Sequence, residues 1–533
     1  MKQVHQISIP LAGVCTLAFG TMASCKNTPK EVQPAMPNIL FVVADNASYP
    51  HFSANGCSWM NTPGFDRLAR EGILFANCYS PNSKSAPARS CILTGLYSWQ
   101  LREAANHLPN FPLDIKVVTE VLQEVGYHVG YTNKGWAPGF EGQINGKPRQ
   151  LTGKPYNQRK LAPPVPDIRT NDYTGNFKDF LDDQGAAPWF FWVGFGEPHR
   201  GYEFGSGIRL GGKTTDMIDR VPAYLPDNET VRTDFLDYGF EIEYADNHLL
   251  MMIEELEKRG MLDNTMIIFT VDNGMGFPRA MANSYEHSTH MPLAIMWKKG
   301  IVRPGREVTD YVNFVDFAPT FLDVSGADPV AHGMQLPSGR SLNDIFKNGK
   351  EGMTTKYRTY TLLGRERHDY GRPENQGYPI RSIIRDGFLY INNLKPDLHP
   401  AGNPETGYLD CDGSPAKTEI LRLKREGRDD RYWQLSFGKR PDEELYHIAV
   451  DEDCLINLAD HPSYKVRKKE MKELLFTILR EHRDPRVIGN GDIFDTYPFH
   501  QDMNWNFWER VQSGEITEPW KQTGWVYRTD YEQ

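Results

Sequence analysis

The apolar run NILFVVAD, residues 38–45, decides the fold class. A continuous hydrophobic segment that ends in a carboxylate is typical of a buried parallel strand with a polar residue at its C-terminal end. Two later runs repeat this arrangement: residues 189–195 are followed by GEPHR (196–200), and residues 265–271 by DNG (272–274). Ligands bind beyond the carboxyl ends of the strands in open α/β sheets, so we expect these three ends to converge on one site.

The segments between these strands carry helical patterns. Residues 119–125 and the longer stretch 234–259 have apolar side chains at helical spacing. Strands that alternate with helices predict an α/β architecture, a large sheet flanked by helices, over residues 38–377.

From residue 378 onward the pattern changes to short pieces. We expect a smaller C-terminal α+β subdomain with an antiparallel sheet over residues 378–533, built from two short strands and a helix (380–384, 388–391 and 464–482). The tail from residue 498 is rich in Trp, Tyr and Phe, which suits packing against the body and also suits stacking on sugars.

Size and charge exclude some classes of partner. The chain has 533 residues with 39% hydrophobic content, enough for a large globular domain and a smaller one. Its formal net charge of -10, without a compensating basic run, argues against nucleic acid as a partner. An anionic substrate would therefore need a locally basic pocket.

The N-terminus has the pattern of an export signal. Lys2 precedes an apolar run over residues 7–23, and Met22-Ala23-Ser24-Cys25 resembles the end of a bacterial lipoprotein signal with a lipid-accepting cysteine. Residues 1–25 are thus expected to be this signal, and the polar stretch 26–37 a flexible tether. A plain secretory signal cleaved nearby is the alternative. Either way we expect export, to the periplasm or outer membrane of a bacterium, with membrane association only through Cys25.

Five cysteines remain outside the signal, and an odd number cannot all pair. Their spacing does not fit a zinc knuckle. A disulfide between Cys411 and Cys454 is one option, the other three being Cys57, Cys78 and Cys91.

Two Asp-Asn pairs follow predicted strands. Asp45-Asn46 and Asp272-Asn273 supply carboxylate and amide oxygens with no cysteine nearby, which favours a hard cation such as calcium over zinc. The alternative for Asp-Asn-Gly is a simple turn.

SAPARSCILTG, residues 85–95, resembles the signature of the formylglycine-dependent (type I) sulfatases: Cys or Ser, any residue, Pro, any residue, Arg, then a short helix reaching Leu-Thr-Gly. The resemblance implies the alkaline-phosphatase-like sulfatase fold and a sulfate-ester or sulfamate hydrolase. Ser85 would be oxidised to formylglycine by a maturase, in bacteria typically an anaerobic radical enzyme. The hydrated aldehyde has two geminal hydroxyls, one to attack sulfur and one to expel sulfate. A proline-containing turn before a helix is the alternative reading of these residues.

The resemblance also implies roles for individual residues. Arg89 would stabilise the formylglycine, Lys134 would bind the sulfate, and His199 would protonate the leaving group or bind the sulfate. Calcium would be bound beside the formylglycine, with one negative charge fewer than usual because Asn46 replaces an aspartate; the ligands would be Asp45, Asn46, Ser85, Asp272 and Asn273.

Two further positions depart from the family pattern. Trp136 stands where a histidine is usual, and Met281 where a basic residue is usual. Three residues near Met281 could restore the positive charge: Arg279, His287 and His290. Three others could bind a uronate or a second sulfate on the substrate through charge-assisted bonds: Arg365, Arg367 and His368. A solvated charged loop is the alternative for these last three.

Scattered motifs after the signal are most similar to the heparan N-sulfatase (sulfamidase) branch of this family, among them EPHR (197–200) and YPIRS (378–382). This similarity implies a sulfated glycan substrate, most specifically the N-sulfate of glucosamine in heparan sulfate. Three alternatives stay open: an O-sulfatase for another glycosaminoglycan or an algal glycan, a phosphoester or phosphonate hydrolase, and a catalytically impaired glycan-binding protein. The dizinc phosphoesterases need extra histidine and aspartate ligands that we do not find in the sequence.

Overall fold

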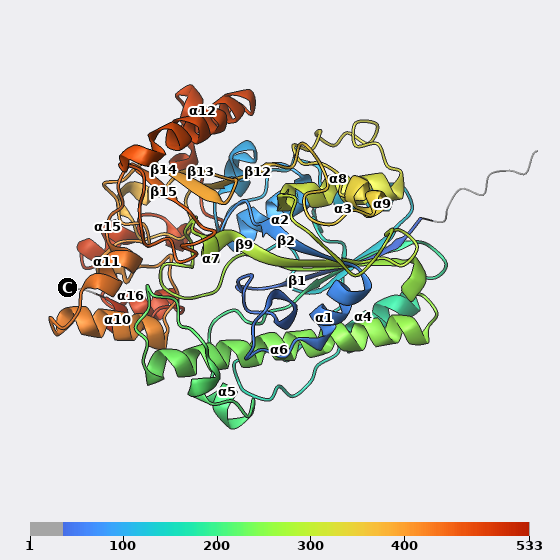
Figure 1. The fold of residues 1–533 in the computed structure, drawn as a ribbon, viewed down its shortest axis with the longest axis horizontal. Coiled ribbons are helices and arrows are strands. Elements are labelled where there is room, and N and C mark those ends of the chain that lie inside the picture. The colour runs from blue at the N-terminus through green and yellow to red at the C-terminus, as the bar shows by residue number, and fades with distance from the viewer. Residues whose placement is uncertain (1–35, 532–533) are drawn as a thin grey trace, which may run out of the picture. The chain divides into compact units, whose positions relative to one another are not determined.

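A mixed sheet of nine strands lies at the centre of the computed structural model, which describes residues 36–531 (Figure 1). The strand order is β10-β2-β9-β8-β1-β7-β3-β6, with β11 pairing with β2. The strands are β1 (Asn38–Ala44), β2 (Ile73–Tyr79), β3 (His128–Asn133), β6 (Lys154–Pro155), β7 (Trp189–Gly194), β8 (Thr265–Val271), β9 (His290–Met296), β10 (Arg306–Val308) and β11 (Val312–Asn313).

The three predicted strands are adjacent in the middle of this sheet. β1 pairs in parallel with β7 on one side and β8 on the other, with Leu40 opposite both Phe191 and Ile267. Their side chains are buried on both faces of the sheet, which explains why the sequence runs are continuously apolar instead of alternating. A small hairpin, β4 (Gln143–Ile144) with β5 (Lys147–Pro148), stands apart from the sheet.

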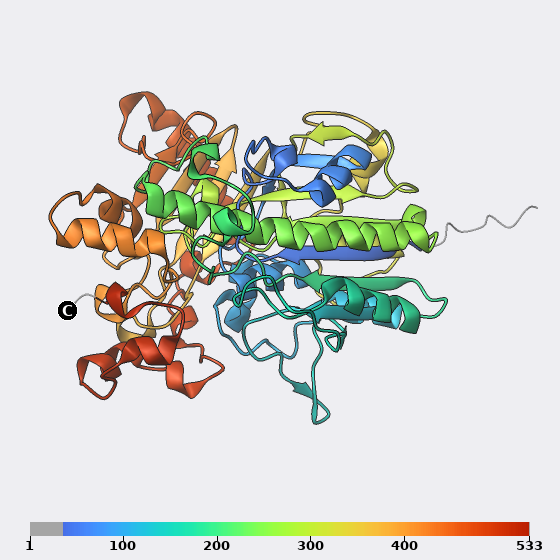
Figure 2. The ribbon, with the colours of Figure 1, turned by 90° about the horizontal axis from the view of Figure 1, so that it is seen from below.

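Helices cover both faces of the sheet (Figure 1). One layer contains α1 (Pro63–Glu71), α4 (Tyr173–Asp183) and α6 (Glu229–Lys258), and α6 crosses in front of the sheet in Figure 2. The other layer contains α2 (Ser85–Thr94), α3 (Val118–Glu124), α8 (Phe317–Ser325) and α9 (Asn343–Asn348). This three-layer arrangement confirms the predicted α/β fold.

The long helix α6 begins earlier than its hydrophobic pattern predicts. Asn228 caps it, because its side-chain oxygen accepts a hydrogen bond from the backbone N–H of Val231 at 3.1 Å. Glu229 in the first turn and Lys258 in the last complement the helix dipole. The capping residue therefore sets the start of the helix, outside the amphipathic segment.

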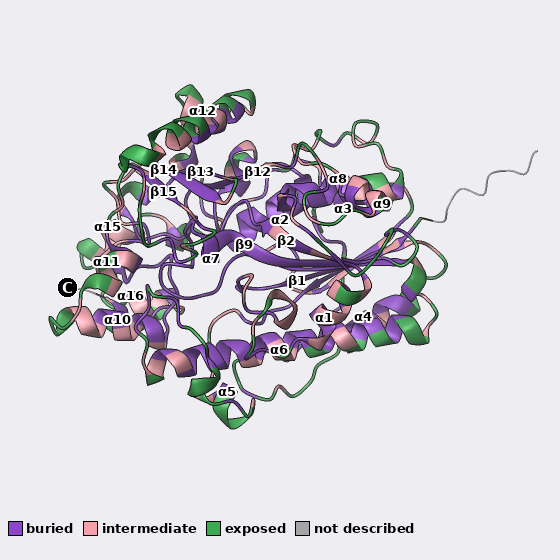
Figure 3. Cartoon of the chain, in the orientation of Figure 1, coloured by how far each residue is buried: buried purple, intermediate pink, exposed green. Residues whose placement is uncertain are grey.

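A second sheet of four antiparallel strands follows, as predicted for the C-terminal part. It is formed by β12 (Tyr360–Arg365), β13 (Ile380–Arg385), β14 (Phe388–Asn393) and β15 (Glu443–Tyr446). β12 precedes residue 378, so this sheet begins earlier in the chain than the change in sequence pattern. Helix α12 (Lys465–Glu481) packs on β13 and β14, with an exposed outer face (Figure 3).

The other α-helices among the described residues are α5 (Ser206–Arg209), α7 (Glu286–Thr289), α10 (Pro415–Arg425), α11 (Arg431–Phe437), α13 (Pro485–Ile488), α14 (Ile493–Thr496), α15 (Phe507–Gln512) and α16 (Pro519–Thr523). The aromatic tail packs against the body, where Phe499, Phe507 and Tyr370 share one apolar cluster. Cys411 and Cys454 are both free and buried, so they do not form the disulfide considered above.

The predicted signal and most of the predicted tether, residues 1–35, lie outside the described part of the chain. Between residues 36 and 531, none of the helices combines the length and apolar character that a membrane crossing requires.

Candidate active site

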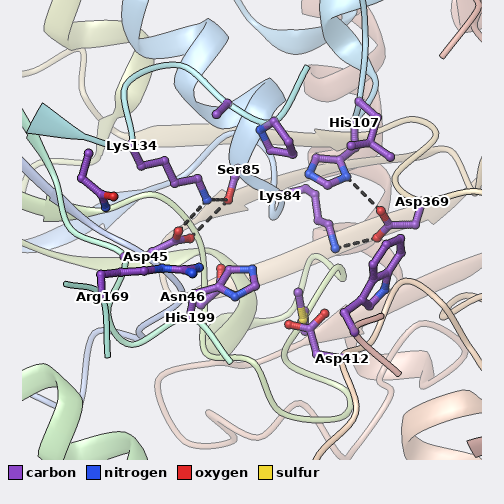
Figure 4. Close-up of a pocket in the computed structure, with 17 residues that line it drawn as sticks. Asp45, Asn46, Lys84, Ser85, His107, Lys134, Arg169, His199, Asp369 and Asp412 are labelled. Atoms are coloured by element: carbon purple, nitrogen blue, oxygen red, sulfur yellow. Dashed lines mark hydrogen bonds and ion pairs between the residues drawn. The ribbon is translucent and has the colours of Figure 1, made fainter. Parts of the chain in front are cut away.

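A cavity of about 500 Å³ opens at the carboxyl ends of the central strands (Figure 4). Strand ends of β1, β3 and β7 and the N-terminus of α2 meet there. Its lining residues are Asp45, Asn46, Lys84, Ser85, His107, Leu108, Asn133, Lys134, Ala137, Pro138, Arg169, Gly196, His199, Met281, Asp369, Asp412 and Trp525.

Backbone hydrogen bonds extend the sheet beyond its strands and bring the candidate site residues together. The N–H of Asp45 donates to the carbonyl of Glu197 at 3.1 Å, and the N–H of Asp272 to that of Ala44, also at 3.1 Å. The N–H of Lys134 donates to the carbonyl of Gly194 at 3.2 Å. Parallel strands thus place the residues that follow β1, β3 and β8 side by side, as the sequence predicted for β1, β7 and β8.

Ser85 is the first residue of α2 and is 4% exposed, at the floor of the cavity. The Nζ of Lys134 donates to its Oγ at 2.9 Å. Its own hydroxyl lies 3.3 Å from Oδ1 of Asp45 and 3.5 Å from Oδ1 of Asn273. A helix N-terminus with unsatisfied N–H groups, next to an ammonium, suits an anionic group at this position.

Lys134 also pairs with Asp45. The distance from its Nζ to Oδ2 of Asp45 is 2.5 Å. Burial by itself would raise the pKa of the Asp45 carboxyl, but the charges of Lys134, His199 and Arg89 outweigh it and hold this pKa below its ordinary value. Asp45 is therefore a carboxylate at neutral pH.

Arg89 is fully buried and connects two parts of the site. Its Nε donates to Oδ2 of Asp272 at 2.9 Å, and its Nη1 donates to the carbonyl oxygens of Lys134 at 2.9 Å and Gly135 at 2.8 Å. These contacts fix the segment that carries Lys134 relative to Asp272. In this geometry Arg89 positions Lys134.

The two Asp-Asn pairs form one buried set of oxygen donors. Asn46 accepts a hydrogen bond from Nδ2 of Asn273 at 2.6 Å, and its backbone N–H faces Oδ1 of Asp272 at 3.3 Å. The candidate donors for a cation are these carboxylate and amide oxygens. Within residues 36–531 no group of three His, Cys, Asp or Glu side chains is placed to hold a metal. Hard oxygen donors of this kind fit calcium.

His199 follows β7 and lines the same cavity. Its Nδ1 lies 2.7 Å from the carbonyl oxygen of Arg200, which accepts only, so Nδ1 carries the proton. Nε2 is then the nitrogen that can exchange a proton with a bound ligand.

The four predicted substrate-binding residues do not line the cavity. Arg279 donates to the carbonyls of Leu435 and Cys454, and His290 binds the carbonyl of Ala76 at 2.8 Å while it stacks between Tyr49 and Tyr79. His287 contacts the hydroxyl of Tyr224 at 2.9 Å, and His368 contacts Oδ1 of Asn82 at 2.8 Å. All four are buried and bound to interior groups.

Arg365 and Arg367 are buried as well. Arg365 pairs with Asp410 at 2.5 Å, and Arg367 donates to the backbone carbonyls of Asp495 and Tyr497. The residue two positions later, Asp369, lines the cavity instead. Arginines in this segment therefore serve the packing of the C-terminal part.

Several lining residues were missed by sequence reasoning: Lys84, His107, Arg169, Asp369, Asp412 and Trp525. Signals were available for three of them: Lys84 directly precedes the serine of the signature, Asp369 directly follows His368, and Trp525 belongs to the aromatic tail. His107, Arg169 and Asp412 come from loops without a motif, so only the tertiary structure brings them to the cavity.

The two residues that differ from the family pattern, Trp136 and Met281, lie in different parts of the structure. Trp136 is buried behind α2, where its Nε1 donates to Oγ of Ser90 at 2.7 Å. Met281 lines the cavity, so a thioether stands in the wall where a basic residue is usual. The cavity instead receives a histidine and a lysine at other positions, His107 and Lys84.

Residues 37–327 match the sulfatase family model. The chain is 26% identical to an ulvan-active sulfatase of Formosa agariphila, covering 87% of this chain and 80% of the relative. It is 24% identical to the human N-sulphoglucosamine sulphohydrolase, covering 93% of this chain and 100% of the relative. The solved structure of BT4656 in complex with its substrate D-glucosamine-2-N,6-O-disulfate superposes with a TM-score of 0.60 at 20% identity, over 84% of this chain and 98% of the other. This last likeness confirms the predicted alkaline-phosphatase-like fold.

Proposed function

Because this chain belongs to the sulfatase family, we propose that it removes sulfate from sulfated glycans and acts on the N-sulfate of a terminal glucosamine, as in heparan sulfate. The main support is the position of Ser85, which lines a cavity of about 500 Å³ and has its Oγ 2.9 Å from Nζ of Lys134. A cavity of this size suits a ligand of one or two sugar rings, which favours action at a chain end. The full-length match to an N-sulphoglucosamine sulphohydrolase supports the N-sulfate.

The reaction would need two groups that the unmodified chain does not supply, formylglycine and calcium. Formylglycine made from Ser85 would supply the nucleophile for sulfur, through a radical-type maturase that acts before or during export. Calcium would polarise the sulfate oxygens, held by Asp45, Asn46, Asp272 and Asn273 beside Ser85.

The other proposed roles in the reaction belong to side chains in and beside the cavity. Nζ of Lys134, which lies 2.9 Å from Oγ of Ser85, would neutralise the charge of a sulfate oxygen bound there. The backbone dipoles at the N-terminus of α2 would stabilise the same negative charge. His199, with its Nδ1 proton directed to the Arg200 carbonyl, would deliver a proton from Nε2 to the departing amine. Arg89 would hold Lys134 in place through the two carbonyls that it binds.

The test is sulfate release from N-sulfated and from 6-O-sulfated glucosamine. The protein is co-produced with a maturase, and peptide mass establishes the state of residue 85. Release from the N-sulfated sugar that disappears in Ser85→Ala supports the proposal. No release by protein with confirmed formylglycine contradicts it, and retained sugar binding would then indicate a catalytically impaired glycan-binding protein.

A second candidate is an O-sulfatase for an algal polysaccharide, favoured by the 26% identity to an ulvan-active sulfatase. Sulfate release from ulvan oligosaccharides without release from N-sulfated glucosamine would select this alternative.

We also propose that the protein is exported and anchored by a lipid on Cys25. Incorporation of labelled palmitate that is lost in Cys25→Ala would support the anchor. Equal labelling of both proteins, or none, would exclude it.

A further inference from the structure

The cavity has two halves of different charge (Figure 4). Ser85, Lys134, Arg169 and His199 lie on one side, together with the Asp45 carboxylate. The opposite side, which we call the distal half, is formed by Lys84, His107, Asp369 and Asp412, together with Trp525, whose carbonyl binds the N–H of Gly413 next to Asp412. The sulfate would bind on the Ser85 side, so the rest of a sugar substrate would meet the distal half.

The distal half offers no free positive charge to a second anion. Nζ of Lys84 lies 2.6 Å from Oδ2 of Asp369, and Nδ1 of His107 lies 2.9 Å from Oδ1 of the same carboxylate. Burial lowers the pKa of His107 despite the nearby Asp369, so His107 is neutral at pH 7. The charges of Lys84 and Asp369 therefore cancel, which leaves Asp412.

Asp412 is 3% exposed, yet its Oδ2 has no hydrogen-bond partner within the described residues. Buried polar atoms are nearly always paired, so a buried carboxylate oxygen that no described protein group satisfies, on a residue that lines the cavity, calls for a donor from outside the protein. A carboxylate accepts hydrogen bonds only, and sugar hydroxyls are suitable donors.

The distal half is held rigidly. Nε1 of Trp525 donates to the carbonyl of Leu409 at 3.0 Å, and the N–H of Gly413 donates to the carbonyl of Trp525 at 2.7 Å. The two bonds connect the tail to the segment that carries Asp412. The half-buried Trp525 ring packs against Tyr370 with centroids 5.5 Å apart.

A second connection joins the two distal carboxylates. Oδ1 of Asp410 accepts from the N–H of Asp369 at 2.7 Å, and its Oδ2 pairs with buried Arg365 and Arg372. Asp369 and Asp412 therefore keep fixed positions before a ligand binds, as a selective site requires.

We propose that the distal half is a subsite for the unsulfated hydroxyl face of the sugar ring, and that Asp412 determines selectivity against a second sulfate or a uronate at that face. This inference rests on the proposed function for the position of the reacting sulfate. Asp412 accepts from a ring hydroxyl, and the Trp525 ring packs on the apolar face of the sugar. An anionic substituent in the same place meets an unpaired buried carboxylate and is repelled.

The experiment measures binding and turnover separately. Calorimetry with Ser85→Ala, which cannot react, compares N-sulfoglucosamine with its derivatives that carry a second sulfate at O3 or O6. We expect at least one disulfated sugar to bind about tenfold or more weakly than the monosulfated one. Asp412→Asn in the same background should reduce this preference by about tenfold, because the neutral amide keeps the shape and removes the repulsion.

The matched control is Asp397→Asn, which changes the net charge equally at an exposed position outside the cavity and should leave the preference unchanged. If Asp412→Asn does not fold, as judged by thermal unfolding, Asp412→Ser provides the same test. Equal binding of all the sugars, absence of binding, or an unchanged preference in the Asp412 variants overturns the subsite.

Turnover by formylglycine-bearing protein separates the two proposals. A retained binding preference without sulfate release would contradict the proposed function and leave the subsite standing. Equal release from mono- and disulfated sugars, unaffected by Asp412→Asn, would do the reverse.

Discussion

The Nζ of Lys134 donates a hydrogen bond to Oγ of Ser85 at 2.9 Å, between the end of β3 and the start of α2. The same nitrogen lies 2.5 Å from Asp45, at the end of β1. One lysine therefore connects Ser85 of the sulfatase signature to the edge of the sheet.

Lys134→Met should lower kcat/KM for sulfate release by about 100- to 1,000-fold, the usual cost of removing one group that stabilises developing negative charge. Methionine keeps the length and most of the volume of the side chain. The exposed Lys299 supplies a matched control, since Lys299→Met removes the same charge from the surface. Equal activity of both variants would exclude Lys134 from catalysis.

Arg89→Lys should reduce activity although the charge is kept. Lysine can still pair with Asp272 but cannot also reach the carbonyls of Lys134 and Gly135, which Arg89 binds with one planar group. Loss of these buried bonds should cost about 2–4 kcal/mol in the free energy of unfolding. Urea unfolding and the kinetics measure both effects, and unchanged values would show that these contacts are dispensable.

Asn46→Asp should strengthen calcium binding by about tenfold, because ligand charge count tunes affinity. The substitution loses no hydrogen bond, since Nδ2 of Asn46 has no partner among residues 36–531 and Oδ1 still accepts from Asn273. Calcium-dependent shifts of the melting temperature of Ser85→Ala measure it without catalysis. A chelator should lower that temperature, and no response to calcium would contradict the proposed site.

Lys84→Met should destabilise the fold by about 3–5 kcal/mol, since it leaves the buried carboxylate of Asp369 without its ion-pair partner. Burial raises the pKa of Asp369, but the charge of Lys84 and the hydrogen bonds from His107 and Lys84 overcome this and hold it below its ordinary value. Adding Asp369→Asn should recover part of the loss. Strictly additive costs in the double variant would show that the two side chains are not coupled.

Asp246→Asn should make stability less dependent on pH. Asp246 of α6 is fully buried against the start of α1, where its carboxylate accepts from the N–H groups of Gly64 and Phe65 at 2.7 Å, and burial raises its pKa to about 7. A raised folded-state pKa means that this group stabilises the fold below about pH 4 and that the contribution is lost as pH rises toward 7. Unfolding free energies at pH 5 and pH 7 should differ less in the variant than in the wild type.

The sequence by itself determined the three central strands of the large sheet and singled out Ser85. Continuous apolar runs that end in polar residues predict β1, β7 and β8, because a strand covered by helices on both faces must be apolar throughout. The signature and the Asp-Asn pairs predicted the cluster around Ser85 for the same reason: parallel strands deliver their C-terminal residues to one edge.

Only the tertiary structure decided the distal half of the cavity. His107, Asp369, Asp412 and Trp525 come from loops and the tail, which have no periodicity that predicts where they lie. Arg279 and His368 show the converse, since polar side chains near a motif pair with interior carbonyls and amides that the sequence does not reveal. Long-range packing, set by buried pairs such as Arg365 with Asp410, selects which polar groups face the ligand.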